Sequence, residues 1–127
     1  GVVLVYDFTT GRHLRSGPDL GPWFAQVLHR WPRRPASASP VTAAALSVDG
    51  LAYEHHPFEV DVAMTRRAYV DYLLTESFVT AAVQRGDDPA EIERWLTSTV
   101  PWPGDDDGGD GPADVVFEGY VLVGRRP

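Results

Sequence analysis

The chain has 127 residues, of which 43% are hydrophobic, and its net charge is −7, so it can form one domain with a core of its own. It contains no cysteine, which excludes disulfides, thiolate nucleophiles and cysteine metal sites. All of its basic residues are arginine, which excludes lysine Schiff-base chemistry and a P-loop lysine. Since these arginines form no basic stripe, we expect no nucleic-acid partner.

No apolar run approaches the roughly 20 residues that a membrane-spanning helix needs. No basic segment leads into an apolar stretch and a cleavage site, as it would in a secretory signal. We therefore expect a cytoplasmic protein with no membrane partner.

The first predicted element is a strand at Gly1–Phe8, with the sequence GVVLVYDF. A continuous apolar run is typical of a strand that is buried on both faces, so we expect a central, parallel strand. Asp7 lies at its carboxyl end, where ligands bind in open α/β sheets, and is a candidate substrate-binding residue. The alternative is that Asp7 only begins the turn that leaves the strand.

Thr9–Leu20 contains glycine and proline without any hydrophobic period, and predicts a long loop. Gly21–Trp31 then has apolar residues at helical spacing, with Pro22 in the first turn and Pro32 after the end. Its aromatic residues could form a lid over an apolar substrate. The alternative is an ordinary amphipathic helix packed on the sheet. The lid candidates are Trp23, Phe24 and Trp31.

The next segments predict a connector at Pro32–Pro40, a short helix at Ala43–Val48 and a lead-in at Leu51–His56. Phe58–Met64 alternates apolar and acidic residues, which is typical of a strand with one buried face. Glu54, His55 and His56 could suggest a metal site. Because neighbouring residues in a strand point to opposite faces, we expect no metal there.

A helical region is predicted over Thr65–Val100, with Thr65 as an N-cap and Gly86 as a stop. Asp88-Pro89-Ala90-Glu91 combines an N-cap acid, a first-turn proline and a third-position glutamate, which indicates a new helix start. Within this region three polar side chains share one helical face. They could orient a hydroxyl or amine in a pocket, or they could be two half-buried tyrosines and an exposed acid. These residues are Tyr69, Tyr72 and Glu76.

The acidic stretch Pro101–Ala113 predicts a turn-rich loop, whose aspartates do not have the spacing of a calcium loop. Asp114–Arg126 predicts a long closing strand that pairs antiparallel with Phe58–Met64.

The segments VVLVYDF, FEVDVAMTRRAYVDYLLTES and VVFEGYVLVGRR, taken in this order, resemble the C-terminal half of a class I S-adenosylmethionine-dependent methyltransferase. The resemblance implies an α/β fold with a partial Rossmann-like sheet made of its last three strands, the final two antiparallel. Gly1–Phe8 would be the fifth strand, Phe58–Met64 the sixth, and Asp114–Arg126 the seventh, inserted beside the fifth. Thr65–Val100 would be a helical insertion that covers the substrate pocket.

The resemblance implies methyl transfer from S-adenosylmethionine to a small molecule, and it identifies no catalytic residue. The glycine-rich donor loop of the family and the acid after its second strand have no counterpart in this sequence. We therefore expect this chain alone to be inactive. The candidate substrate-binding residues are Asp7, Trp23, Phe24, Tyr69, Tyr72 and Glu76.

The alternative is a non-catalytic module with the same elements, which binds a small ligand or assembles with copies of itself. Uncovered sheet edges favour such association, since an exposed strand can recruit another strand.

Overall fold

A computed structural model describes residues 1–8, 11–33, 42–43, 50–104 and 111–127 of the chain. The short helix expected at Ala43–Val48 and most of the connector Pro32–Pro40 lie outside these residues. The described elements, in chain order, are β1 (Val2–Phe8), β2 (His13–Leu14), α1 (Gly21–Arg30), β3 (Ala52–Met64), α3 (Arg66–Leu73), α4 (Ser77–Gln84), α5 (Pro89–Thr99) and β4 (Ala113–Arg125).

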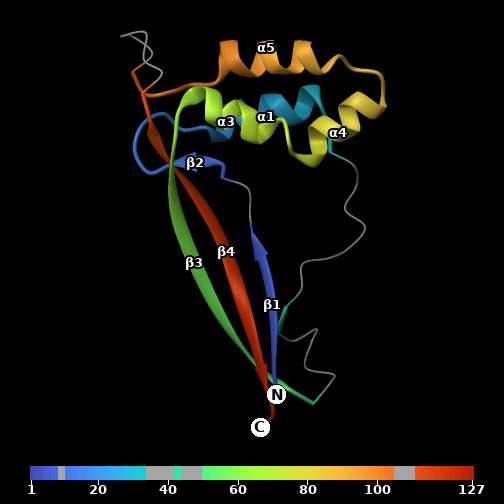
Figure 1. The fold of residues 1–127 in the computed structure, drawn as a ribbon, viewed down its shortest axis with the longest axis vertical. Helices are drawn as coiled ribbons and strands as arrows, with labels where there is room; N and C mark the ends of the chain where they lie inside the picture. The colour runs from blue at the N-terminus through green and yellow to red at the C-terminus, as the bar shows by residue number, and fades with distance from the viewer. Residues whose placement is uncertain (9–10, 34–41, 44–49, 105–110) are drawn as a thin grey trace. The chain divides into compact units, whose positions relative to one another are not determined.

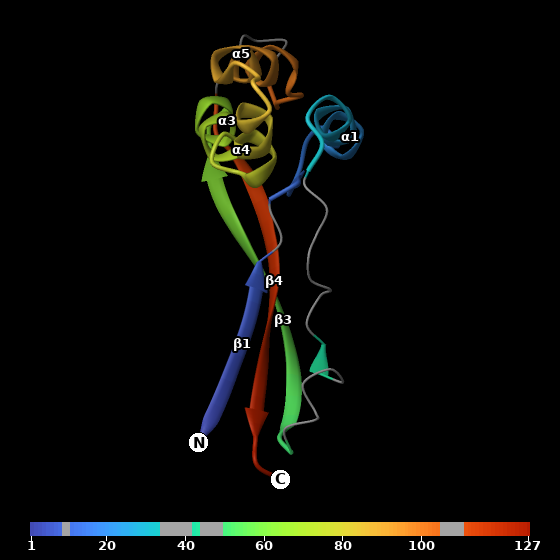
Figure 2. The ribbon, with the colours of Figure 1, turned by 90° about the vertical axis from the view of Figure 1, so that its right-hand side faces the viewer.

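The strands form one sheet in which β4 pairs with each of the other three. Strand β1 is antiparallel to β4, with Val2 opposite Arg125 and Phe8 opposite Gly119. Strand β2 pairs antiparallel with an earlier stretch of β4, where Leu14 is opposite Val115. Figures 1 and 2 show β4 between β1 and β3, with β3 running antiparallel to it.

The chain divides into two compact units. The first unit consists of residues 1–11, 36–60 and 117–127, and contains β1 with parts of β3 and β4. The second unit consists of residues 12–35 and 61–116, and contains β2, the described helices and the remaining parts of β3 and β4.

In the first unit, β1 is exposed, although its apolar sequence predicts a buried strand. Val2 is 59% exposed, Leu4 62% and Tyr6 70%. The expectation of a parallel strand buried on both faces is wrong for the described residues, since β1 is antiparallel to its one neighbour there. An apolar run favours burial of a strand. Whether the strand is buried depends on other strands and helices that cover it, and the sequence of the run does not specify these.

Strand β4 approaches its neighbours closely at two glycines in the first unit. A Cβ atom on Gly119 would lie 2.5 Å from the carbonyl oxygen of Asp7 and 2.6 Å from the Phe58 ring. A Cβ on Gly124 would overlap the Tyr53 ring. Glycine therefore lets aromatic rings of β3 lie directly against the β4 backbone.

Strand β3 is one continuous strand, Ala52–Met64, and includes the segment expected to lead into it. The expected buried face is only partly present, because Val60 is 45% exposed and Val62 is 39% exposed. The loop expected at Thr9–Leu20 also contains a short strand, β2, because β4 is long enough to pair with a second segment.

In the second unit the helices bury a common apolar core. Full burial of a valine, leucine, isoleucine or phenylalanine side chain stabilises the folded state by about 1.5–3 kcal/mol relative to leaving it exposed. Its largest fully buried side chains include Leu20, Val27, Tyr69, Leu73, Phe78, Ile92, Leu96 and Trp102.

The helix ends of the second unit follow the expected local signals. Thr65 caps α3, since its Oγ1 accepts a hydrogen bond of 3.1 Å from the amide of Ala68. Asp88 caps α5 by accepting from the amide of Ala90 at 3.0 Å. Gly86 has a φ of +103°, the left-handed conformation that glycine adopts readily after a helix. None of the described helices has both the length and the apolar character needed to cross a membrane.

Candidate functional site

Five of the six candidate residues lie in the second unit, and Asp7 lies in the first. Asp7 is exposed on β1, in register with Tyr120 of β4. The site is therefore built from the second unit, to which Trp23, Phe24, Tyr69, Tyr72 and Glu76 belong.

Trp23 joins α1 to α5. Its ring is buried, its Nε1 donates a hydrogen bond of 2.9 Å to Thr99 Oγ1, and it stacks on Trp95 with the ring centres 6.3 Å apart. Trp31 packs edge-on against the Trp95 ring, with the two ring centres 5.2 Å apart. These contacts are those of a helix-packing residue, the alternative that the helical spacing leaves open.

Phe24 and Glu76 share Arg12 as a neighbour. The Arg12 guanidinium lies over the Phe24 ring, 4.0 Å from its centre, within the range of a cation–π contact. The Nη2 atom of Arg12 is also 4.0 Å from Oε2 of Glu76. This places an aromatic face, a guanidinium and a carboxyl group next to one another.

The expectation that Tyr69, Tyr72 and Glu76 share one helical face is wrong, because α3 ends at Leu73 and Glu76 is the extended N-cap residue of α4. Its side chain is only 9% exposed. Burial raises the pKa of this carboxyl above its ordinary value, against the charge of Arg33 and a hydrogen bond from Tyr72, which both lower it. Among the described residues, Oε1 of Glu76 has no hydrogen-bond partner. Glu76 therefore has a buried oxygen that can still accept a hydrogen bond.

Tyr69 supports this cluster from the core. It is fully buried, and burial, with Glu76 and Tyr72 nearby, raises the pKa of its hydroxyl. Its ring lies 5.5 Å from the ring of Trp102, whose Nε1 donates to the carbonyl of Gly111 at 2.9 Å. Tyr69 thus fixes the α3 backbone from which Tyr72 extends, with the two tyrosine rings 6.3 Å apart.

The structure brings Phe24, Tyr72 and Glu76 together and adds Arg12, which the sequence does not single out. Arg12 lies between Gly11 and His13, in a stretch without any period or motif. Its contact with Glu76 depends on how β2 and α4 pack, so no local signal could have identified it.

A second arginine, Arg15, is next to β2 and has a different role. It makes a two-pronged ion pair with Asp61, with contacts of 3.1 Å from Nε and 2.6 Å from Nη2. This hydrogen bonding lowers the pKa of Asp61. Because the two side chains are 47% and 37% exposed, this ion pair contributes little to the stability of the fold.

The described residues do not fit the adenosyl donor that the family resemblance implies. Gly17 follows β2 and precedes α1, but a Cβ on it would meet Pro103 at 3.0 Å, so there is no open cradle above it. The amide of Gly21 at the start of α1 already donates to Asp19 Oδ1 at 2.9 Å. A carboxylate therefore occupies the helix terminus that a donor's anionic group could use.

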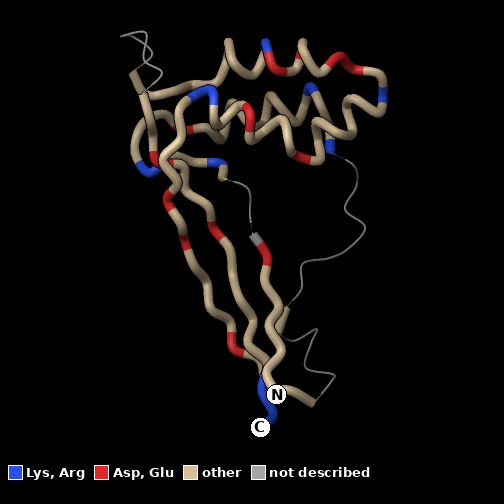
Figure 3. Tube along the Cα trace, viewed as in Figure 1, with Lys and Arg blue, Asp and Glu red and all other residues tan. Residues whose placement is uncertain are grey.

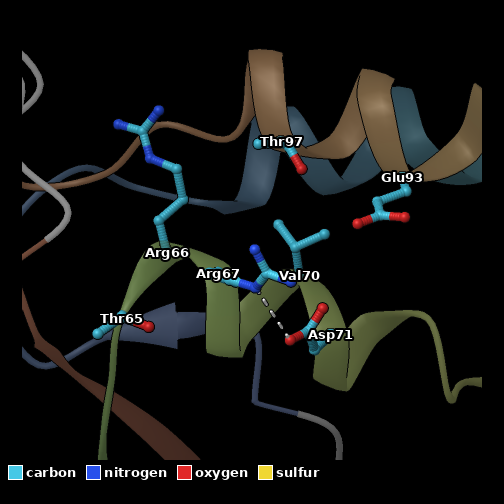
Figure 4. Close-up of a pocket in the computed structure, with 7 residues that line it drawn as sticks. All are labelled: Thr65, Arg66, Arg67, Val70, Asp71, Glu93 and Thr97. Atoms are coloured by element: carbon cyan, nitrogen blue, oxygen red, sulfur yellow. Dashed lines mark ion pairs between the residues drawn. The ribbon is translucent and has the colours of Figure 1, made fainter.

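A pocket of about 400 Å³ opens between the first turn of α3 and α5 (Figure 4). Basic residues Arg66 and Arg67 line it together with acidic Asp71 and Glu93. Arg67 and Asp71 form an ion pair of 3.9 Å, and both are exposed. Because its charges compensate one another in contact with solvent, this pocket is a weaker candidate than the buried Glu76 cluster.

Acidic residues lie along the strands, whereas the helices carry both acidic and basic residues (Figure 3). The described part of the first unit has acidic residues at Asp7, Glu54, Glu59 and Glu118, and its basic side chains lie only at the C-terminal end. No group of three or more histidine, aspartate or glutamate side chains in the described part of the chain could hold a metal ion.

Comparisons of the chain with protein-family models, with curated proteins and with solved structures found no match. The sheet topology and the Glu76 cluster therefore carry the functional argument.

Proposed function

We propose that the chain is the C-terminal, substrate-lid portion of an S-adenosylmethionine-dependent methyltransferase that acts on a small molecule. The observation that supports this most is the order of the strands. In the proposed family the last strand is antiparallel and is inserted beside the fifth. Here the last strand, β4, lies between β1 and β3 and is antiparallel to β1 (Figure 1).

The exposure of β1 agrees with this proposal. Its Val2, Leu4 and Tyr6 side chains are more than half exposed, which is costly for an apolar strand in water. In a larger Rossmann-like sheet, further strands and helices would cover the free edge and both faces of β1. The four described helices supply the other expected feature, a helical region outside the strands.

In the proposed enzyme the methyl donor is held outside the described residues, since these do not fit it. The role of this chain is to bind and orient the acceptor molecule and to keep water away from it. Tyr72 and Glu76 supply the polar contacts, and the buried Phe24 ring holds the Arg12 guanidinium beside Glu76. Trp23 positions α1 through its bond to Thr99.

The test is calorimetric titration of S-adenosylmethionine into two proteins, the whole gene product and this 127-residue chain. We expect micromolar binding to a whole gene product that supplies the donor loop, and no binding to the chain alone. Binding to the chain alone would contradict the argument about the donor site. No binding to the whole gene product would contradict the methyltransferase proposal.

The exposed β1 strand also favours the second candidate, a module that assembles through its sheet edge. Light scattering on this chain and on a Leu4→Lys variant separates the two proposals. A stable, stoichiometric dimer that the charge on β1 dissociates favours the module. Disordered aggregation that the variant reduces favours the exposed part of a larger sheet.

A further inference from the structure

We propose that Oε1 of Glu76 is the hydrogen-bond acceptor for a neutral hydroxyl group on the bound molecule, an alcohol or a phenol. Glu76 is 9% exposed, and Oε1 has no partner among the described residues. A buried carboxylate oxygen without a donor is costly, so such an atom calls for a partner from outside.

Oε1 of Glu76 needs a hydrogen-bond partner whether the carboxyl group is ionised or protonated. An ionised carboxylate needs a donor at Oε1, and a neutral carboxylic acid with its proton on Oε1 needs an acceptor there. A hydroxyl group can serve in both cases, since it donates through its hydrogen and accepts through its lone pairs. An amine cation can only donate.

The charges around Glu76 also favour a neutral partner. Arg12 lies 4.0 Å from Oε2, and the charge of Arg33 also acts on the carboxyl. The positive charges of two arginines thus already act on a single carboxyl group. A third cation at Oε1 would be repelled by both, whereas a neutral hydroxyl would not.

The surroundings indicate where the rest of the molecule would lie. Arg12 is 29% exposed, so the cluster lies close to solvent on the side of this guanidinium. Tyr72, which bonds to Glu76, is half-buried and provides aromatic surface beside the carboxyl, whereas the Phe24 ring is buried beneath Arg12. The molecule is therefore small and carries an apolar or aromatic body beside its hydroxyl.

The binding site does not depend on the methyltransferase proposal, but one consequence rests on it. If the chain is the lid of a methyltransferase, the hydroxyl bound by Glu76 is the methyl acceptor. Its oxygen forms the bond to the methyl carbon as the carbon–sulfur bond of the sulfonium breaks, the thioether leaves, and the hydroxyl proton passes to the Glu76 carboxylate.

The test is an NMR titration of this chain with phenol and with anisole, which has the same ring and oxygen but no O–H donor. We expect phenol to bind several-fold more tightly than anisole and to shift the resonances of Glu76 and Tyr72. Glu76→Gln replaces the charged acceptor with a neutral one and should weaken phenol binding about ten-fold. Glu93→Gln makes the same change at an exposed site on α5 and should leave phenol binding unchanged.

Three results would overturn the inference. Phenol and anisole could bind equally well, a comparison that needs no variant to fold. Phenol could bind Glu76→Gln as tightly as the unaltered chain, or protonated benzylamine could bind the unaltered chain more tightly than phenol. If phenol fails while the whole gene product still binds S-adenosylmethionine, only this inference is wrong. If phenol binds but the whole gene product does not bind the donor, only the proposed function is wrong.

Discussion

Arg12 and Glu76 form a long ion pair, with Nη2 of Arg12 4.0 Å from Oε2 of Glu76. The separation exceeds that of a direct hydrogen bond, so Arg12 stabilises the charge of Glu76 without satisfying its oxygens. The other oxygen, Oε1, is buried without a partner in the described part of the chain. The open arrangement suits a site that completes its hydrogen bonds with a ligand.

The pH dependence of stability tests the state of Glu76. Its pKa is raised in the folded protein above the ordinary 4.5, mainly by burial. The folded state therefore binds more protons than the unfolded state from about pH 4.5 up to the raised pKa, and the free energy of unfolding falls as pH rises through this range.

Glu76→Gln removes this effect, so it should be more stable than the unaltered chain at pH 7 and lose that advantage towards pH 4. Thermal unfolding of both proteins at several pH values measures this difference. A variant that is less stable at pH 7, by the same amount at every pH, would show that Glu76 is a structural residue. Stabilisation together with weaker phenol binding would be the signature of a residue kept for function at a cost in stability.

The bond from Trp23 Nε1 to Thr99 Oγ1 is expected to hold α1 against α5. Thr99→Val keeps the shape of the side chain but removes the acceptor, leaving the N–H of a buried tryptophan unpaired. We expect a loss of about 1–3 kcal/mol in the free energy of unfolding, measured by urea denaturation. Thr97→Val, an exposed position on the same helix, is the matched control and should change little. Equal effects of the two variants would mean that the bond contributes nothing.

The Asp88 cap should account for much of the local stability at the start of α5. Its side chain accepts from the amide of Ala90 at 3.0 Å, and Asp88→Ala removes this acceptor. We expect a loss of about 1 kcal/mol, with faster amide exchange in the first turn of α5. Asp88→Asn retains a capping oxygen and should keep most of the stability. If both variants lose the same amount, the negative charge matters and the cap does not.

Gly119→Ala tests the close pairing of β1 and β4. The added Cβ would lie 2.5 Å from the carbonyl oxygen of Asp7, a backbone atom that cannot move away alone. We expect the pairing to open, with a loss of about 1–3 kcal/mol and faster amide exchange in β1. Gly111→Ala adds the same atom where nothing lies within 4 Å, and it should be close to neutral. Unchanged exchange in β1 after Gly119→Ala would mean that the two strands are not held this closely.

Local signals predicted the helices of the second unit well. The caps Thr65 and Asp88, and Gly86 after α4, act through hydrogen bonds and backbone angles within a few residues, so their effect can be derived from the sequence. The same holds for the apolar spacing that predicted the buried Trp23 and Phe24 on α1. The three long strands were predicted, and the placing of the last strand beside the first came from the family resemblance, but the burial of the strands was not predicted. Val60 and Val62 alternate as expected in β3 and are nevertheless exposed.

The sequence by itself determined the helix starts at Thr65 and Asp88, the stop at Gly86 and the three long strands. Only the tertiary structure decided that β1 is exposed, that β2 pairs with β4 and that Arg12 lies beside Glu76. The reason is physical. Caps and helical faces depend on residues a few positions apart, whereas strand pairing and the charge around a buried carboxyl depend on segments far apart in the chain. The unpartnered oxygen of Glu76 belongs to this second kind of feature, and it is the one from which the ligand class follows.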